Sequence, residues 1–262
     1  MHARKNNITL SGIVLTFNQA DNITSCLKSI DWLDEIIIVD SYSADKTIQI
    51  VKRYTDKIYY RKFDGDFAKQ RDFAVEKASG DWILVLDADE TLLANTGEEI
   101  EKLIKNDEGD GFWFPRRNYI NEETYLQHGY FYPDWQLRLF KKKSFVRYKG
   151  LVHEYPIVRG SKKRVRTIEI FHNPSNSKYD SFFSFGRFFP YIKIEAREKI
   201  RAGESWVRLV SCGLRDLLRE FYWSFIRDKG YRDGYNGFRA ALIYGMYKGA
   251  ICYFALYLRL KS

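Results

Sequence analysis

The chain has 262 residues, of which 29% are charged and 17% aromatic, with only 5 prolines. This composition excludes disordered, collagen-like and low-complexity proteins, and the length allows one large domain or one domain with an appendage. The cysteines Cys26, Cys212 and Cys252 are each more than 35 residues from the next. We therefore expect neither a paired disulfide framework nor a zinc knuckle, and a reducing compartment is favoured.

The net charge of +9 is concentrated at the C-terminal end. Residues 182–262 contain 15 Lys and Arg against 7 Asp and Glu, a net +8, which leaves 28 against 27, a net +1, for residues 1–181. The same C-terminal segment holds 19 of the 44 aromatic residues. Cationic and ring side chains together favour a polyanionic partner, either nucleic acid or an anionic lipid surface.

No targeting or membrane-spanning segment is predicted. The N-terminal residues lack the apolar run of a secretory signal. The most apolar segment, 238–260, contains Arg239, Lys248 and Arg259, and its longest uncharged run is the ten residues 249–258. A bilayer needs roughly 20. We expect the protein to stay on the cytoplasmic side.

The first ninety residues alternate short β-branched runs with amphipathic stretches. Runs without polar alternation indicate strands that are buried on both faces, hence a parallel sheet covered by helices. The predicted strands are 8–17, 35–40, 57–61 and 81–86, and the predicted helices are 21–30, 45–54 and 66–78, the last with Asp66 as N-cap. Two further strands, 111–116 and 136–140, follow in an α+β pattern, and the chain is mostly helical after residue 179.

Three polar clusters follow these strands: Thr16-Phe17-Asn18, Asp40 to Ser43, and Asp87 to Glu90. Because ligands of such sheets gather at the carboxyl ends of the strands, the clusters converge on one crevice. Neither a dinucleotide-binding glycine motif nor a P-loop follows any of them, which argues against the enzymes that use these motifs.

Asp87 and Asp89 are two residues apart in an extended segment, so their carboxylates face the same side. Two oxygen ligands suit Mg²⁺ or Mn²⁺, with a diphosphate completing the shell and Lys69 and Arg71 adding positive charge. The alternative is a haloacid-dehalogenase-like phosphatase with Asp87 as nucleophile and Asp89 as acid/base. That class carries its nucleophile on the first strand and needs a later acidic pair, and the sequence shows neither feature.

Four motifs together resemble the nucleotide-sugar half of glycosyltransferase family 2, which has the GT-A fold. They are Thr16-Phe-Asn18, the segment 40–47 from Asp40, Phe67-Ala-Lys-Gln-Arg71, and the segment 81–90 that ends in Asp87-Ala-Asp89-Glu90. Pro133-Asp134-Trp-Gln-Leu-Arg138 and Val152-His153-Glu154 resemble the acceptor-side motifs of a subgroup that includes bacterial lipopolysaccharide core β-glucosyltransferases, as does the basic segment 229–238.

The resemblance implies a GT-A fold, Rossmann-like and α/β, with a mostly parallel sheet between helices, followed by a basic, aromatic-rich helical extension. The catalytic domain would span residues 1–181, with a donor half at about 8–110 and an acceptor half at about 111–181, and the extension residues 182–262. Thr16, Asn18, Asp40, Arg71 and Asp87 would bind the donor. Asp89, Asp87 and His153 would hold the metal ion, Mg²⁺ or Mn²⁺.

Inverting transfer needs a carboxylate that removes the acceptor proton. Asp134 is the first candidate by the resemblance, although the chain has Pro-Asp where the family commonly has Glu-Asp, and Glu90 and Glu154 are the reserves. Arg138 would pair with Asp134 or the diphosphate, or is otherwise an edge-strand arginine. His172 has a weaker claim than His153 to the metal. For stacking on the acceptor sugar we expect Tyr130, Tyr132 and Trp135, whereas core packing explains Trp113.

A helical projection of residues 206–227 gives one wide apolar face and one Arg-rich face, whereas residues 238–260 are apolar nearly all round. The amphipathic segment 206–227 packs on the enzyme's own core or lies at a lipid interface. The segment 238–260 is buried in the protein, in a partner or at the lipid boundary, and its rings Tyr244, Tyr247, Tyr253 and Tyr257 favour that boundary. No nucleic-acid-binding motif is present, so nucleic acid is not an expected partner.

We therefore expect an inverting, metal-dependent transferase that moves a sugar, glucose or a related hexose, from a UDP-linked donor to a glycolipid such as lipopolysaccharide core. It would work peripherally at the inner, anionic face of the cytoplasmic membrane. A capsule glycan or a protein is the alternative acceptor.

Overall fold

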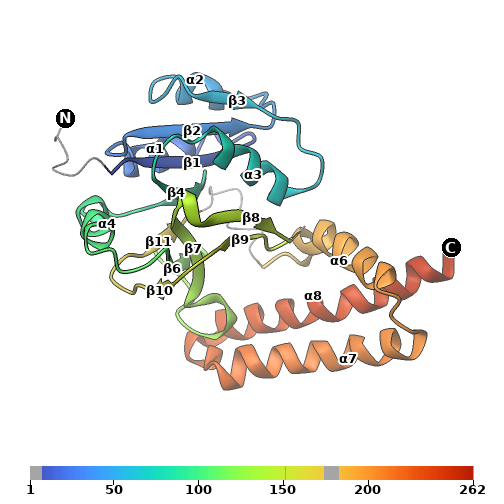
Figure 1. Ribbon diagram of the computed structural model, residues 1–262. Helices are drawn as coiled ribbons and strands as arrows, with labels where there is room; N and C mark the ends of the chain where they lie inside the picture. Colours follow the sequence, from blue (N-terminus) through green and yellow to red (C-terminus); the bar gives the residue numbers. More distant parts are fainter. Residues whose placement is uncertain (1–7, 151, 174–182, 262) are drawn as a thin grey trace. The chain divides into compact units, whose positions relative to one another are not determined.

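The computed structural model describes residues 8–150, 152–173 and 183–261 (Figure 1). The chain forms two compact units. The sheet unit comprises residues 1–116 and 135–175, and the helical unit comprises residues 117–134 and 176–262. The loop 117–134, which the sequence assigned to the acceptor half, thus belongs with the C-terminal helices. The predicted domain boundary between residues 181 and 182 lies outside the described residues.

The strands are short, as expected for a twisted α/β sheet. They are β1 (Leu10–Thr16), β2 (Glu35–Asp40), β3 (Ile58–Tyr60), β4 (Trp82–Asp87), β5 (Glu90–Thr91), β6 (Gly111–Asn118), β7 (Asp134–Lys141), β8 (Phe145–Lys149), β9 (Tyr155–Val158), β10 (Lys162–Arg164) and β11 (Ile170–His172).

The helices of the sheet unit are α1 (Ile23–Ser29), α2 (Thr47–Val51), α3 (Phe67–Lys77) and α4 (Thr96–Lys105), and those of the helical unit are α6 (Phe189–Arg201), α7 (Trp206–Tyr222) and α8 (Gly234–Lys261). Short helical turns cover Gly129–Phe131, Lys142–Ser144, Phe185–Phe188, Trp223–Arg227 and Gly230–Asp233. Asp66 caps α3 as predicted, because its side chain accepts from the backbone N–H of Lys69 at 3.1 Å.

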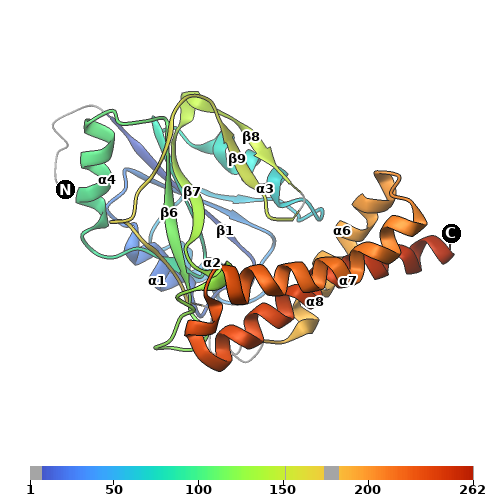
Figure 2. The same cartoon turned by 90° about the horizontal axis from the view of Figure 1, so that it is seen from below.

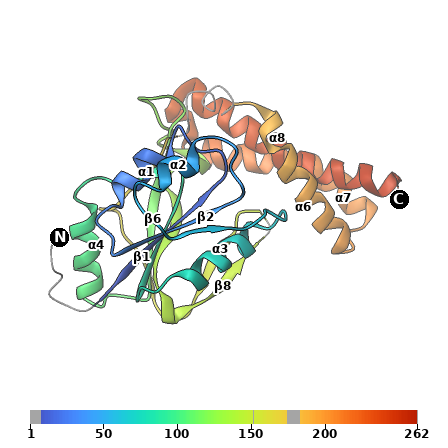
Figure 3. The same ribbon diagram turned by 90° about the horizontal axis from the view of Figure 1, so that it is seen from above.

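The main sheet has nine strands in the order β3-β2-β1-β4-β7-β6-β11-β5, with β10 paired to β6. Strands β3, β2, β1 and β4 run parallel to one another. Figure 3 shows β1 and β2 of this parallel half from above. Strand β7 then joins β4 antiparallel, with Ile83 opposite Phe140. Strands β8 and β9 form a separate hairpin. The parallel half aims the carboxyl ends of its strands at one edge of the sheet.

The buried strands feed two cores because successive side chains point to opposite faces. On β4, Leu84 and Leu86 pack with residues of α1, α2 and α4, whereas Ile83 and Val85 pack with α3 and the β8–β9 hairpin. Trp113 packs against this second cluster, as expected. Helices therefore cover both faces of the sheet, and the predicted α/β class with a helical extension is confirmed.

The helical unit is held together by contacts of α8 with α6 and α7 (Figure 2). Its core contains Ile192 from α6, Leu209 from α7, and Tyr247 and Ile251 from α8. Where α7 crosses α8, a Cβ on Gly249 would lie 2.7 Å from the carbonyl oxygen of Gly213. Glycine is required there because the two backbones approach too closely for any side chain.

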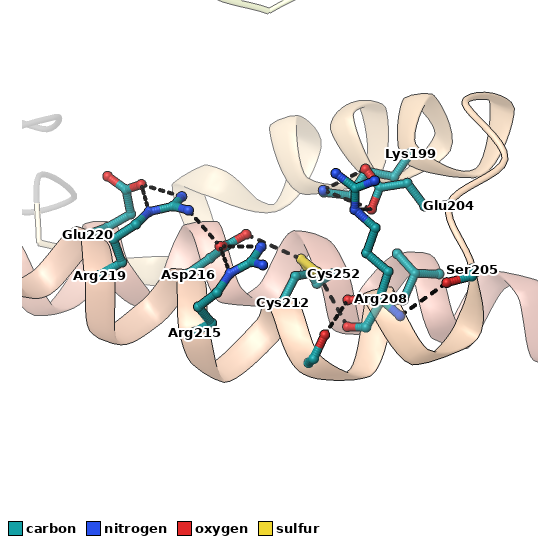
Figure 4. Close-up of a disulfide and its surroundings, with 12 residues drawn as sticks. Lys199, Glu204, Ser205, Arg208, Cys212, Arg215, Asp216, Arg219, Glu220 and Cys252 are labelled. Carbon is teal, nitrogen blue, oxygen red and sulfur yellow. Dashed lines mark hydrogen bonds and ion pairs between the residues drawn. A yellow bond between two sulfur atoms is a disulfide. The ribbon is translucent and has the colours of Figure 1, made fainter.

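A disulfide joins Cys212 of α7 to Cys252 of α8 (Figure 4). The expectation of unpaired cysteines is therefore wrong for these two. They are 40 residues apart in the sequence, but α7 and α8 pack side by side and bring their buried sulfur atoms together. Asp216 lies in the same buried group, and Cys26 is free. Spacing alone does not show a pairing that tertiary packing creates.

Helix α8 is also longer than the apolar segment predicted from the sequence. It has 28 residues, and at about 1.5 Å per residue it measures roughly 42 Å. By length and composition alone, the segment Gly230–Lys261 is sufficient to cross a membrane. Buried core helices pass the same test, and Tyr244, Tyr247, Ile251 and Ala255 of α8 are indeed buried in the helical unit.

Candidate functional site

The carboxylate of Asp87, the last residue of β4, lies between two arginines. Arg71 of α3 donates from Nη2 to Oδ1 at 2.6 Å, and Arg138 of β7 donates from Nη2 to Oδ2 at 2.7 Å. Burial by itself raises the pKa of Asp87, but the two guanidinium groups outweigh it and hold this pKa well below its usual range. Asp87 is therefore ionised, with an arginine on each oxygen.

Glu90 is fully buried and organises the same cluster. One of its oxygens accepts from Arg138 at 2.6 Å and from Arg116 at 2.8 Å, and the other accepts from the backbone N–H of Asp87 at 3.0 Å. A general base must reach the acceptor hydroxyl, and these bonds occupy both Glu90 oxygens inside the protein. We assign Glu90 to holding the arginines rather than to proton transfer.

Glu154 completes the cluster, because its carboxylate accepts from Arg71 Nε at 2.9 Å. Three arginines thus face three carboxylates. Both Arg71 and Arg138 are more than nine-tenths buried. Strand β7 lies between β4 and β6, so the alternative of Arg138 as an edge-strand arginine is wrong. Arg71 Nη1 and Arg138 Nε are buried without a hydrogen-bond partner among the described residues. The cluster therefore keeps unused donors that an anionic ligand would satisfy.

The predicted donor-binding residues of β1 and β2 lie together, and their bonds link the ends of these strands and the loops that follow them. Asp40 is fully buried and accepts from Thr16 Oγ1 at 2.8 Å and from the backbone N–H of Ser43 at 2.8 Å. Asn18 Oδ1 accepts from the backbone N–H of Ala44 at 2.8 Å. These bonds fix the shape of the loop that follows β2, and contact of these residues with the donor stays a prediction.

Tyr42 of that loop and Tyr60 form an exposed aromatic pair, which is not among the predicted site residues. Tyr42 has a left-handed backbone conformation with φ 66°, and its ring is 61% exposed. Its centroid lies 5.7 Å from that of Tyr60, the last residue of β3. Exposed rings held rigidly at strand ends suit stacking on a planar ligand. The sequence signal for this pair was Tyr42 itself, an aromatic residue inside the polar cluster that follows the second predicted strand.

The possible metal ligands separate into two groups. Asp89 Oδ2 lies 3.6 Å from His172 Nε2, and both side chains are partly exposed. Strand β11 positions His172 opposite Glu90 of β5. His153 is instead exposed in the loop before β9, where its φ is 59°. Thus His172, which the sequence motifs favoured less than His153 as a metal ligand, is the histidine beside Asp89.

The donor set of Asp89 and His172 fits a divalent ion whose remaining ligands are water and phosphate oxygens. Each Asp87 oxygen already accepts a hydrogen bond from an arginine. That Asp87 is also a metal ligand stays a prediction. Asp87 is better placed to orient the arginines around an anionic ligand.

Asp134 is the first residue of β7, and it is grouped with the helical unit, whereas the rest of β7 belongs to the sheet unit. Its carboxylate accepts a hydrogen bond from Asn118 Nδ2 at 3.1 Å. Tyr130 in the same unit stacks on Tyr244 with centroids 4.1 Å apart. Trp135, in the sheet unit, has the guanidinium groups of Arg164 and Arg166 over its ring at 5.2 and 5.5 Å. The predicted acceptor rings are therefore already engaged by neighbouring side chains, and their role with a sugar remains a prediction.

Among curated relatives, the SPbeta prophage-derived glycosyltransferase SunS of Bacillus subtilis is 29% identical over 207 residues, which are 77% of this chain and 46% of SunS. The lipopolysaccharide core biosynthesis glycosyltransferase LpsC of Rhizobium meliloti is 30% identical over 176 residues, 63% of either protein. The chain spans about half the length of SunS. The solved structure of S. aureus TarS 1–349 in complex with UDP-GlcNAc aligns with a TM-score of 0.49 and 15% identity, over 94% of this chain and 91% of that one.

The family model of Glycosyl transferase family 2 matches residues 11–167, more than half of the chain. The matched range includes every element of the arginine–carboxylate cluster. It displaces the phosphatase alternative, and the geometry agrees, because a carboxylate held by two arginines is a poor nucleophile. The chain belongs to glycosyl transferase family 2.

Proposed function

We propose that the protein transfers a hexose, such as glucose, from a UDP-linked donor to a hydroxyl of a glycolipid, such as lipopolysaccharide core. The arginine–carboxylate cluster around Asp87 carries the proposal, with Asp89 and His172 beside it. Negative charge develops on the diphosphate leaving group during glycosyl transfer. Such a site offers this group cationic side chains and a position for a metal ion. The relationship to LpsC supports the glycolipid acceptor.

The arginines act on the leaving group in this proposal. As the bond between the anomeric carbon and the diphosphate oxygen breaks, Arg71 and Arg138 stabilise the departing charge through their remaining N–H groups. Asp87 and Glu90 fix both guanidinium groups beforehand, so little reorganisation is needed during the reaction. A divalent ion held by Asp89 and His172 would neutralise diphosphate charge.

The acceptor oxygen forms the new bond to the anomeric carbon from the face opposite the diphosphate, so the configuration inverts. Its proton passes to a carboxylate, and Asp134 is our candidate for this base. Asp134 begins the same strand that carries Arg138. The exposed Tyr42 and Tyr60 rings are candidates for stacking on the nucleotide base.

Thermal denaturation with UDP, GDP, CMP and a simple phosphate ester, each with and without Mn²⁺, tests the donor and the metal. We expect UDP with Mn²⁺ to raise Tm more than either alone, and Asp89→Asn to abolish the Mn²⁺-dependent part. Turnover of the phosphate ester without stabilisation by any nucleotide would refute the proposal.

The acceptor needs a separate assay. Radiolabelled UDP-glucose is incubated with glycolipid from a strain lacking the gene, with a capsule glycan, and with protein extract. Label in the glycolipid alone supports the proposal, whereas label in the glycan or in protein moves this family 2 enzyme to the alternative acceptor.

A further inference from the structure

Helix α7 turns an apolar stripe away from the rest of the helical unit. Val207, Val210, Leu214, Leu218 and Tyr222 are all exposed, Val207 by 79% and Leu214 by 58%. Their spacing of three or four residues places them along one side of the helix. The buried side carries Leu209, Cys212, Gly213 and Asp216 instead. Part of the apolar face that the sequence predicted is therefore left exposed by the packing within the unit.

Helix α8 has a stripe of the same kind. Its exposed members are Phe238, Leu242, Met246, Tyr253, Tyr257 and Leu260. They recur every three, four or seven residues and so share one side of the helix. Tyr244 and Tyr247, also predicted to lie at a lipid boundary, are buried on the opposite side.

Two members of the α8 stripe contact α7 at residues beside the α7 stripe, and we call the two stripes together the outer face. At one end of the helix pair, Phe238 of α8 touches Phe221 of α7 edge to face, with centroids 5.8 Å apart. Further along, the ring of Tyr253 packs directly over Gly213 of α7, where even a Cβ would lie 2.3 Å from it. Monomeric soluble proteins rarely expose two neighbouring apolar stripes of this length without a use for them.

The α7 border of the outer face is cationic. Arg208 and Arg215 of α7 are 69% and 58% exposed, whereas their carboxylate partners Glu204 and Asp216 are only 17% and 12% exposed (Figure 4). Each ion pair thus keeps its acid inside and its arginine outside. The helical unit consequently shows positive charge beside the apolar face, which complements an anionic surface.

We propose that the outer face of α7 and α8 docks on an anionic lipid bilayer and lies in the plane of the interface. An apolar stripe bordered by arginines, with rings such as Tyr253 and Tyr257, has the features of an interfacial helix. A second copy is a poorer occupant, because face-to-face docking would bring two cationic borders together. This inference does not depend on the proposed reaction.

Sedimentation of the full chain with vesicles tests the docking. One vesicle contains phosphatidylcholine alone and the other also contains phosphatidylglycerol. We expect binding to the anionic vesicle that weakens with salt, and about tenfold weaker partition for Leu214→Glu/Leu218→Glu. Arg208→Gln/Arg215→Gln should weaken binding to the anionic vesicle alone. The matched control is Leu93→Glu, an exposed leucine of the sheet unit, which should bind like the wild type.

Several outcomes would overturn the inference. One is equal recovery in the supernatant with both vesicles, and another is unchanged binding of Leu214→Glu/Leu218→Glu. Light scattering that shows a dimer dispersed by these substitutions would assign the face to a second copy. Resistance to alkaline carbonate extraction would make α8 a spanning helix. Quenching of wild-type tryptophan fluorescence by brominated lipids needs no variant, and we expect it to report Trp206 and Trp223.

Discussion

Arg138 Nη2 lies 2.7 Å from Asp87 Oδ2, a bond between the neighbouring strands β7 and β4. The same nitrogen also serves Glu90 at 2.6 Å. One guanidinium therefore neutralises a carboxylate at the rim of the site and another that is fully buried beneath it. The arginine couples the stability of the sheet unit to the charge of the site.

Replacing Arg138 by glutamine should destabilise the protein by roughly 3–5 kcal/mol, because it removes a partner from two carboxylates, one of them buried. Urea unfolding measures the change. Lys69→Gln is the control, because the Lys69 side chain that pairs with Asp64 and Asp66 is 63% exposed. This substitution should lower the free energy of unfolding by less than about 1 kcal/mol. Similar losses for the two variants would show that the Arg138 network is not a strong ion cluster.

The position of His172 beside Asp89 leads to a comparison of two histidines. His172→Ala should weaken Mn²⁺ binding in the presence of UDP by at least about tenfold, whereas His153→Ala should leave it close to the wild type. Titration calorimetry with Mn²⁺ measures both. If His153→Ala is the damaging change, the metal site is the one that the sequence motif first indicated.

Asp134→Asn should lower kcat by about 10²- to 10⁴-fold, the usual contribution of a general base. UDP binding should stay unchanged, because the substitution keeps the shape of the side chain and leaves the bonds of Arg71 and Arg138 to Asp87, Glu90 and Glu154 in place. Rates with saturating donor and calorimetry with UDP separate the two effects. Retained turnover would pass the role to Glu154, since the Glu90 oxygens are already bonded inside the cluster.

The sequence predicted the parallel half of the sheet well because a strand buried on both faces leaves a continuous apolar run. Residues 35–40 coincide with β2, and helix α3 begins after its capping residue Asp66. The ligand-binding edge followed from the ends of those strands. What the sequence did not show depends on tertiary contacts. The pairing of Asp89 with His172 requires β11 to lie beside β5, and the Cys212–Cys252 bond requires α7 to pack along α8.

Gly249→Ala should destabilise the helical unit by about 1–3 kcal/mol, although alanine is usually the better helix former. The added Cβ would lie 2.7 Å from a backbone oxygen of Gly213, so α7 and α8 have to move apart. Gly186→Ala is the control, because its Cβ would meet only the Ser184 hydroxyl at 3.5 Å. Denaturant unfolding compares them, and equal stability would mean that the crossing tolerates a wider spacing.

Glu35, at the start of β2, should make stability depend on pH in the acid range. Burial alone raises its pKa, but hydrogen bonds from Lys57, Ser11 and Ser79 outweigh it and lower the pKa from 4.5 to about 2. The folded state therefore binds this proton less readily than the unfolded chain, and the resulting stabilisation is present above pH 4.5. It is lost as the pH falls toward 2.

Glu35→Gln removes the titrating group and tests this dependence. The difference in unfolding free energy between wild type and variant should be roughly 3 kcal/mol near neutral pH, from the linkage value of about 1.4 kcal/mol per pKa unit. This difference should shrink steadily below pH 4.5, because the wild type then loses the stabilisation by the ionised Glu35 carboxylate, which the variant lacks at every pH. Urea unfolding across this range measures it. A difference that stays constant with pH would mean that the Glu35 pKa is the same in the folded and unfolded states.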